Sequence, residues 1–247
     1  MKSWPANFFV LLCALCCSSA MAQPGKLCSG DAGLRKLEGY WSSAHFLALL
    51  DKHGEWTAAM QAADSQQIAL SIKNGQIKQN LAWHEGDESR YCLRLQGDKV
   101  WLLDETKKRP EQGPYQRLGK LDQREADLYL ARLIQGCFIS AEKEQWCFQQ
   151  GRLSINGQQV NARLELDLSE LDLYGTPLHV QGRKLPFWYL VKRTDGWAVF
   201  EDDYASNENR KLVNPETSKP WRVLSPTKQQ ALPAHLNQMS IHHDEKQ

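Results

Sequence analysis

The stretch Leu37–Ala44, LEGYWSSA, decides the fold, because Ile134–Ala141, IQGCFISA, repeats its pattern 97 residues later. Two further pairs of segments follow in the same order. Leu70–Gln76 matches Leu153–Gln158 at an offset of 83 residues, and the segment starting at Tyr91 matches the one starting at Trp188, with Trp101 and Trp197 offset by 96. The order of the matches predicts one structural unit used twice. The shorter middle offset predicts an insertion of about 14 residues early in the first copy.

Hairpin signals accompany the repeat. Asn74-Gly75 and Asn156-Gly157 each stand between alternating apolar and polar residues. Asn-Gly favours a type I′ turn, which needs positive φ at both central residues, so both dipeptides predict two-residue β-hairpins. Residues 91–96 and 100–104 predict another hairpin around Gly97-Asp98.

The second copy has the clearest strand pattern. Apolar residues occupy every second position from Val160 to Leu168, which predicts one long, half-buried strand. Pairing through the Asn156-Gly157 turn would set Leu153 opposite Val160. The same register would bring Cys147 near Leu166 and onto the apolar face.

Helices are expected at two main places. Ser43 is suited to cap a short helix over 44–52, which would account for the insertion in the first copy. Asp122 with Glu125 is typical of a helix start, and apolar residues spaced three and four apart follow until Gly136. The second pattern predicts a helix over 122–135 that packs on a sheet.

Both ends of the chain differ from its middle. A lysine, a short apolar run and Ala20-Met21-Ala22 predict a signal peptide cleaved after Ala22. The predicted divisions are a signal peptide (1–22), a first β half (23–105), a connector (106–121), a helix with the second β half (122–205) and a polar, partly disordered C-terminal extension (206–247).

The charge and cysteine content of the chain reduce the number of possible functions. Without the signal the chain carries 29 basic and 29 acidic side chains, a balance that argues against nucleic acid as a partner. No second apolar run is long enough to cross a bilayer.

Four cysteines remain after cleavage, which in an exported chain predicts two disulfides. A hairpin turning near Glu142 would place Cys137 opposite Cys147, leaving Cys28 to pair with Cys92.

Candidate binding residues are mostly tryptophans. Eight remain after cleavage, and they suit either a ligand-binding surface or simply a β core. Trp41, Trp83 and Trp101 are predicted to line a ligand site, together with Glu85. His84-Glu85 offers an acid–base pair, but adjacent strand residues point to opposite faces, so the polar end of a strand is the favoured interpretation.

The leader 23–36 predicts a short helix with Asp31 as its N-cap, which ends just before Gly39. Gly39-Tyr40-Trp41, preceded by Leu37, resembles the G-x-W opening of lipocalin-type proteins. In that family the first strand begins just after a short helix, and the tryptophan plugs one end of an antiparallel barrel. The resemblance covers residues 37–104 best, and it implies a small apolar ligand held inside the barrel. Arg193-Thr194-Asp195 comes near a later motif of the family, but Gly196 follows it.

Taken together, these features predict a mainly β protein made of two related halves, as an antiparallel barrel or two packed antiparallel sheets, with one packed helix. One barrel of about ten strands is favoured over two small β domains side by side, because closure removes exposed edges. The predicted function is an exported, periplasmic or secreted, non-catalytic binding protein for a small apolar ligand or an exported protein partner. An envelope-acting hydrolase and an inhibitor or immunity-type protein are the alternatives. Neither a catalytic motif nor a cofactor or metal site is predicted.

Overall fold

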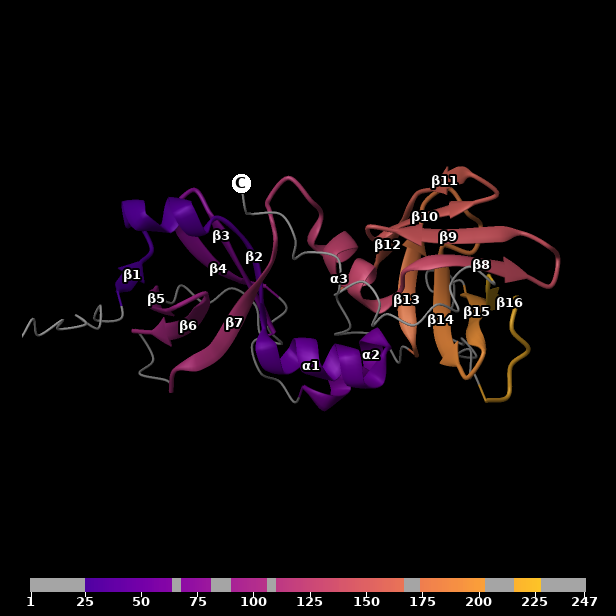
Figure 1. Ribbon diagram of the computed structural model, residues 1–247, viewed down its shortest axis with the longest axis horizontal. Coiled ribbons are helices and arrows are strands. Elements are labelled where there is room, and N and C mark those ends of the chain that lie inside the picture. Colours follow the sequence, from indigo (N-terminus) through magenta and orange to yellow (C-terminus); the bar gives the residue numbers. More distant parts are fainter. Residues whose placement is uncertain are drawn as a thin grey trace, which may run out of the picture.

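The chain forms two antiparallel β-sheets, one beside the other along the long axis of the molecule (Figure 1). The structure, a computed structural model, describes residues 25–63, 68–80, 90–105, 110–166, 174–202 and 216–227. The predicted fold class, mainly β with two halves and a packed helix, is confirmed. The preference for one ten-stranded barrel is wrong, because each half closes on its own strands.

The first sheet is a nearly closed barrel. Its strands lie in the order β1-β5-β6-β7-β2-β3-β4. Each strand from β2 to β7 pairs with the next one along the chain except at β4 and β5, and β7 returns to pair with β2. The strands are β1 (Lys26–Cys28), β2 (Gly39–Ser43), β3 (Ala69–Lys73), β4 (Gln76–Asn80), β5 (Tyr91–Gln96), β6 (Lys99–Asp104) and β7 (Gln112–Gly119).

The second sheet follows the same rule with nine strands, in the order β11-β10-β9-β8-β16-β15-β14-β13-β12. The last strand again pairs with the first, and the opening lies between β11 and β12. The strands are β8 (Gly136–Ser140), β9 (Gln145–Gln149), β10 (Arg152–Ile155), β11 (Gln158–Val160), β12 (Ala162–Leu164), β13 (Thr176–Val180), β14 (Phe187–Arg193), β15 (Gly196–Asp202) and β16 (Arg222–Pro226).

The predicted hairpin turns are confirmed. Asn74 and Gly75 have φ of 53° and 70°, and Asn156 and Gly157 have φ of 51° and 77°, as a type I′ turn requires. The β5–β6 hairpin turns at Gly97-Asp98. Asn-Gly therefore fixes the hairpin next to the opening of each barrel, which explains why this segment is repeated.

Two of the predicted divisions contain strands that the sequence pattern does not indicate. The connector 106–121 contains β7, and the C-terminal extension 206–247 contains β16. Both strands carry breakers, Gly113-Pro114 and Pro226, that obscure an alternating pattern. Each is nevertheless the closing strand of its barrel, so its pairing depends on partners distant in sequence. The tail beyond Thr227, expected to be disordered, lies outside the described residues.

The long strand predicted over 160–168 is interrupted at Asn161. The side chain of Asn161 donates to Gln181 Oε1 at 2.5 Å, and its carbonyl accepts the backbone N–H of Gln181 at 3.0 Å. The predicted pairing of Leu153 with Val160 is confirmed, whereas Cys147 lies opposite Ser154 rather than Leu166. The sequence pattern missed the turn at Gln150-Gly151. As a result β10 lies between β9, which carries Cys147, and β11, which carries Val160.

In the described part of the chain four helices accompany the sheets, and their bounds are η1 (Ala32–Leu37), α1 (Ala44–His53), α2 (Trp56–Ala62) and α3 (Glu125–Leu133). The predicted helix at 44–52 is confirmed as α1, which ends at Gly54, where φ is 69° and the N–H donates to Leu50 O at 2.7 Å. The helix start expected at Asp122 is wrong, because Arg124 occupies the N-cap position of α3. None of the described helices has the length and apolar character needed to cross a membrane.

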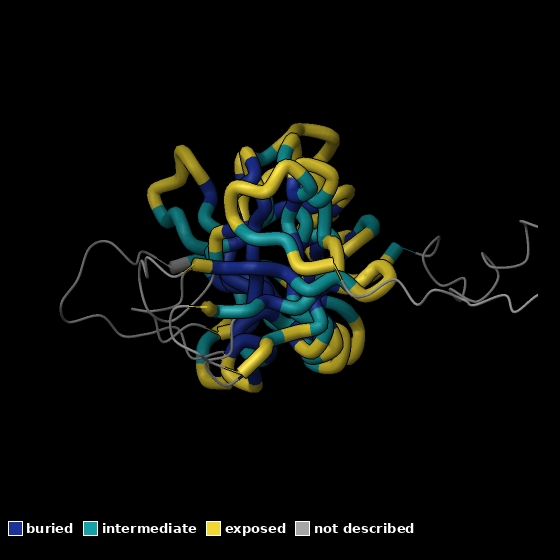
Figure 2. The backbone as a smooth tube through the Cα atoms, turned by 90° about the vertical axis from the view of Figure 1, so that its left-hand side faces the viewer, coloured by how far each residue is buried: buried dark blue, intermediate teal, exposed yellow. Residues whose placement is uncertain are grey.

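The helices inserted in the first copy pack against the second barrel. Phe46 of α1 and Trp56 of α2 lie edge-to-face at 5.4 Å, and Tyr129 of α3 lies 5.1 Å from Trp56. Thr57 Oγ1 donates to Gly175 O at 2.8 Å, and Trp56 N–H donates to Thr176 Oγ1 at 3.2 Å. The buried strands lie at the centre of the molecule and the exposed segments at its turns (Figure 2). The insertion thus joins the two barrels.

Glu55 leads to a prediction at this junction. It accepts the backbone N–H of Lys192, and its burial raises the pKa of its carboxyl above the ordinary value of 4.5. The folded state then binds the proton more tightly than the unfolded chain, so stability is lost as pH rises from about 4.5 through the folded pKa. We expect Glu55→Gln, which keeps an acceptor without the charge, to flatten this loss in urea unfolding measured from pH 4 to 8. An unchanged pH dependence would contradict the assignment.

Candidate functional site

The predicted ligand residues do not converge. Trp41 is buried, its indole N–H donates to Leu37 O at 2.9 Å, and the Arg117 guanidinium lies 5.9 Å from its ring centre. Trp101 lies on the outer face of β6, where Arg94 stacks on it at 4.3 Å. The other two predicted residues, Trp83 and Glu85, lie outside the described residues, as does His84.

Most of the other tryptophans belong to the core. Trp146 and Trp188 are fully buried in the second barrel, with ring centres 5.3 Å apart, and Trp221 covers both. The indole N–H of Trp146 donates to Glu144, which also accepts a hydrogen bond from Arg222 at 2.7 Å. The hydrogen bond from Arg222 holds the pKa of Glu144 below its ordinary value. The three rings contact one another and pack on the buried core, so the cluster belongs to the interior of the barrel.

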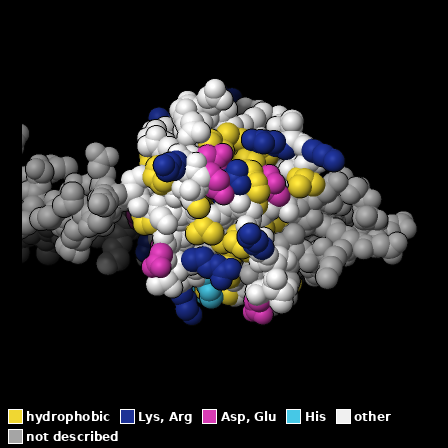
Figure 3. Space-filling model, turned by 90° about the vertical axis from the view of Figure 1, so that its right-hand side faces the viewer, with side chains coloured by type: hydrophobic (Ala, Val, Ile, Leu, Met, Phe, Trp, Pro, Cys, Tyr) yellow, Lys and Arg dark blue, Asp and Glu magenta, His cyan; other side chains and the backbone are white. Residues whose placement is uncertain are grey.

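The outer end of the second barrel, which carries the β8–β9 turn, has mixed chemistry. Figure 3 shows hydrophobic, basic and acidic side chains intermixed on this face. The Nε of Arg222 lies 3.4 Å from a carboxylate oxygen of Glu142 and 2.7 Å from one of Glu144, so its charge is neutralised. This face therefore does not provide a concentrated charge of one sign for a ligand.

Both predicted disulfides are present. Cys28 bonds to Cys92, and Cys137 bonds to Cys147. The expectation that Cys147 shares the apolar face is wrong, because its neighbours Trp146 and Phe148 point inward and the sulfur lies on the outer side. In the described residues, one group of cysteine and acidic side chains has metal-ligand spacing, Cys28 and Cys92 with Glu105. Its sulfurs are bonded to each other, so they are not available as thiolate ligands.

A set of adjoining clefts lies between α3 and the β10–β11 hairpin and extends to the end of β7. Their volumes are about 600, 300, 710 and 400 Å³, within the range of ligand sites. We call them together the junction groove, because neighbouring clefts share lining residues. The residues that define the groove are Arg117, Lys120, Asp122, Gln123, Arg124, Asp127, Gln135, Gln149, Gln150, Arg152, Ser154, Gln159, Val160 and Asn161.

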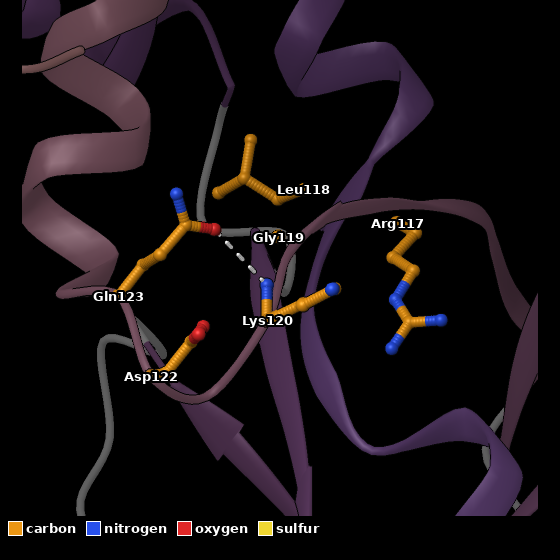
Figure 4. A pocket seen from close by; sticks show the side chains of 6 residues that line it. All are labelled: Arg117, Leu118, Gly119, Lys120, Asp122 and Gln123. Atoms are coloured by element: carbon orange, nitrogen blue, oxygen red, sulfur yellow. Dashed lines mark hydrogen bonds between the residues drawn. The ribbon is translucent and has the colours of Figure 1, made fainter.

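The end of the groove next to the first barrel is shown in Figure 4. Gln123 accepts the backbone N–H of Lys120 at 3.3 Å, which holds the turn between β7 and α3. Lys120 and Asp122 are exposed beside this turn. Arg117 lies farther along and donates to Glu38 O. The turn therefore presents one ammonium group at this end of the groove.

The middle of the groove is formed by Arg152 of β10 and Gln159 of β11. Each of them lines three of the four clefts. Arg124 is engaged by Asp127, with guanidinium nitrogens 2.8 and 2.9 Å from the carboxylate oxygens. Arg152 is exposed and has no ion pair within the part of the chain that the structure describes. Its guanidinium is therefore available for a ligand.

The lining of the junction groove combines amide, charged and hydroxyl side chains. It offers side-chain amides, cations, the carboxylates of Asp122 and Asp127, and one hydroxyl, that of Ser154. Among these described lining residues there is no histidine, and the sulfur of Cys147 is bonded to Cys137. The described lining therefore offers neither an imidazole nor a free thiol. Amides and arginines instead match carboxylates and main-chain groups of a polar ligand.

The sequence does carry a signal for this groove. Gln149-Gln150-Gly151-Arg152 and Gln158-Gln159 place four amides and a cation near one hairpin. The signal is weak because glutamine is common on exposed strands, and tryptophans are the more conspicuous candidates. Comparisons of the chain with protein-family models, with curated proteins and with solved structures find no match.

Proposed function

We propose that this is an exported, non-catalytic binding protein that holds a polar, acidic ligand in the junction groove. The free guanidinium of Arg152 at the centre of the groove is the observation that supports this function. A signal peptide cleaved after Ala22 would deliver the chain to the periplasm or the medium. The two disulfides are typical of proteins that fold in such an oxidising environment.

The charge of the groove supports an acidic ligand. Four cations and two carboxylates line it, and Asp127 is already paired with Arg124. Arg152 and Lys120 remain to attract an anion. An arginine binds a carboxylate through two parallel hydrogen bonds, which favours a carboxylate-bearing ligand.

The described interiors of the barrels support a surface site over an internal one. In the first barrel, side chains such as Trp41, Leu93 and Tyr115 form one packed cluster. In the second, Trp146, Trp188 and their neighbours do the same. Close packing of this kind leaves little room for the small apolar ligand that the lipocalin resemblance implies.

A lipocalin-like architecture is part of the proposal at the level of the fold. The short helix η1 leads directly into β2, and Trp41 is anchored to the end of that helix. The last strand of the barrel pairs beside it and covers its ring with Arg117. These features support the resemblance for the first barrel, while the second has Phe138 at the corresponding position of β8.

The test is a titration with N-acetyl-glutamyl-glutamate, followed by NMR of the ¹⁵N-labelled protein. We expect shifts in the amides of residues 147–161, and weaker binding by about tenfold in Arg152→Gln, because a charged hydrogen bond contributes ~1.5–3 kcal/mol. Arg163→Gln is the matched control, since Arg163 is exposed on β12 of the same sheet and lines none of the four clefts. No shifts at millimolar probe, or equal losses in both variants, would refute the proposal.

A further inference from the structure

The strand β11 leaves main-chain groups open to the junction groove. It is the terminal strand of the nine-stranded sheet and pairs only with β10 in the part of the chain described. In a two-residue hairpin the residues that flank the turn, here Ile155 and Gln158, exchange hydrogen bonds. The next pair along, Ser154 with Gln159, is then a pair without them. The N–H and C=O of Gln159 therefore point away from β10.

The outward N–H and C=O of Gln159 lie beside the junction groove. Gln159 lines three of the clefts, and the following residues Val160 and Asn161 line the cleft that holds about 300 Å³. The chain turns away at Asn161, whose carbonyl is occupied by Gln181. Arg152 lies on the neighbouring strand, two positions before Ser154. An open strand edge and a free cation thus lie side by side.

We propose that the free edge of β11 binds an extended acidic peptide segment of another exported protein as an added strand. The main chain of the peptide pairs with the N–H and C=O of Gln159, and a carboxylate of the peptide pairs with Arg152. Side-chain amides of Gln150 and Gln159 bind the remaining main-chain groups. The inference rests on the proposed function and names the partner of the same groove.

A peptide fits this groove better than an acidic oligosaccharide does. Sugars bind protein clefts largely by stacking on aromatic rings, and the described lining of the three clefts around Arg152 includes one aromatic residue, Phe148, which is fully buried. Strand addition requires only an unpaired edge, which β11 provides. The partner is therefore expected to present an extended segment with alternating acidic side chains.

The experiment compares Gln159→Pro with Gln159→Ala, using a ten-residue peptide of alternating glutamate and threonine. Proline removes the outward N–H, which carries no ladder bond, while alanine removes only the side-chain amide. We expect affinity to fall about tenfold or more in the proline variant and about threefold or less in the alanine variant. A peptide in which lysine replaces glutamate should not bind.

Hydrogen exchange of the native protein provides a second measurement that needs no variant. The Gln159 amide should exchange quickly in the free protein and at least tenfold more slowly with the acidic peptide bound. Unchanged exchange at Gln159 under saturating peptide, or equal losses in the two variants, would overturn the inference.

If an oligogalacturonate binds in place of the peptide, the partner is a glycan and strand addition is refuted. If the dipeptide probe binds through Arg152 but the long peptide adds no protection, the proposed function stands and this inference fails. If neither probe binds, both fail.

Discussion

Gly151→Ala is expected to destabilise the protein by about 4 kcal/mol, from about 1 kcal/mol of backbone strain and about 3 kcal/mol of overpacking. Gly151 has φ of 75°, in the left-handed region that disfavours a side chain. A Cβ at this position would lie 1.9 Å from the carbonyl oxygen of Asp127. The β9–β10 turn therefore packs directly on the backbone of α3, which cannot yield as a flexible side chain would.

Gly157→Ala is the matched control for this prediction. Gly157 has nearly the same φ, 77°, but a Cβ added there would meet no atom within 4 Å. We expect it to cost about 1 kcal/mol, from backbone strain alone. Urea unfolding followed by tryptophan fluorescence gives both values. Equal losses in the two variants would show that the contact between the turn and α3 is absent, and that the groove wall they form is not rigid.

The turn also illustrates what could be predicted from sequence. The Asn-Gly hairpins were predictable because their geometry is set by two adjacent residues, Asn156 and Gly157 in the second copy. Gly151 carries a similar positive φ, but it follows Gln150, which has φ of 51° without any asparagine signal. The strand β10 was therefore merged into a longer pattern, and the register of Cys147 was misplaced.

The closing strands were not predictable for a different reason. The strand β16 is only five residues long and ends in proline, and its neighbours β8 and β15 come from elsewhere in the sequence. The free energy that holds it comes from two ladders that exist only when both neighbours are in place. A local pattern cannot report such a partner, and the same holds for β7 in the first barrel.

The candidate site could not be predicted for the same reason, because it joins segments that are distant in the sequence. Arg152 and Gln159 are separated by one hairpin and could be paired from sequence, but their meeting with the start of α3 depends on Gly151 packing on Asp127. Trp41 was correctly expected to lie at the start of a strand after a short helix. Trp41 is buried beneath Arg117 of β7, so it is part of the barrel core. This burial depends on the position of β7, which the G-x-W motif alone does not predict.

The Cys28–Cys92 disulfide is expected to contribute more stability than the Cys137–Cys147 disulfide. The first closes a loop with a sequence separation of 64, and the second one of 10. The chain-entropy relation gives about 4 kcal/mol for the longer loop and about 3 kcal/mol for the shorter one. The first bond also holds β1, a three-residue strand that pairs, among the described strands, with β5 only.

Replacing both cysteines of each bond by alanine tests this order in urea unfolding under non-reducing conditions. The Cys28 and Cys92 double variant should lose about 4 kcal/mol and release β1, seen as faster hydrogen exchange at Leu27 and Leu93, which face each other across the pair. The Cys137 and Cys147 variant should keep its β8–β9 hairpin, because Phe138 and Trp146 remain paired beside the bond and their rings stay buried. A larger loss in the second variant would mean that the bond stabilises the barrel by holding β8 for its closing partner β16, rather than by shortening the unfolded chain.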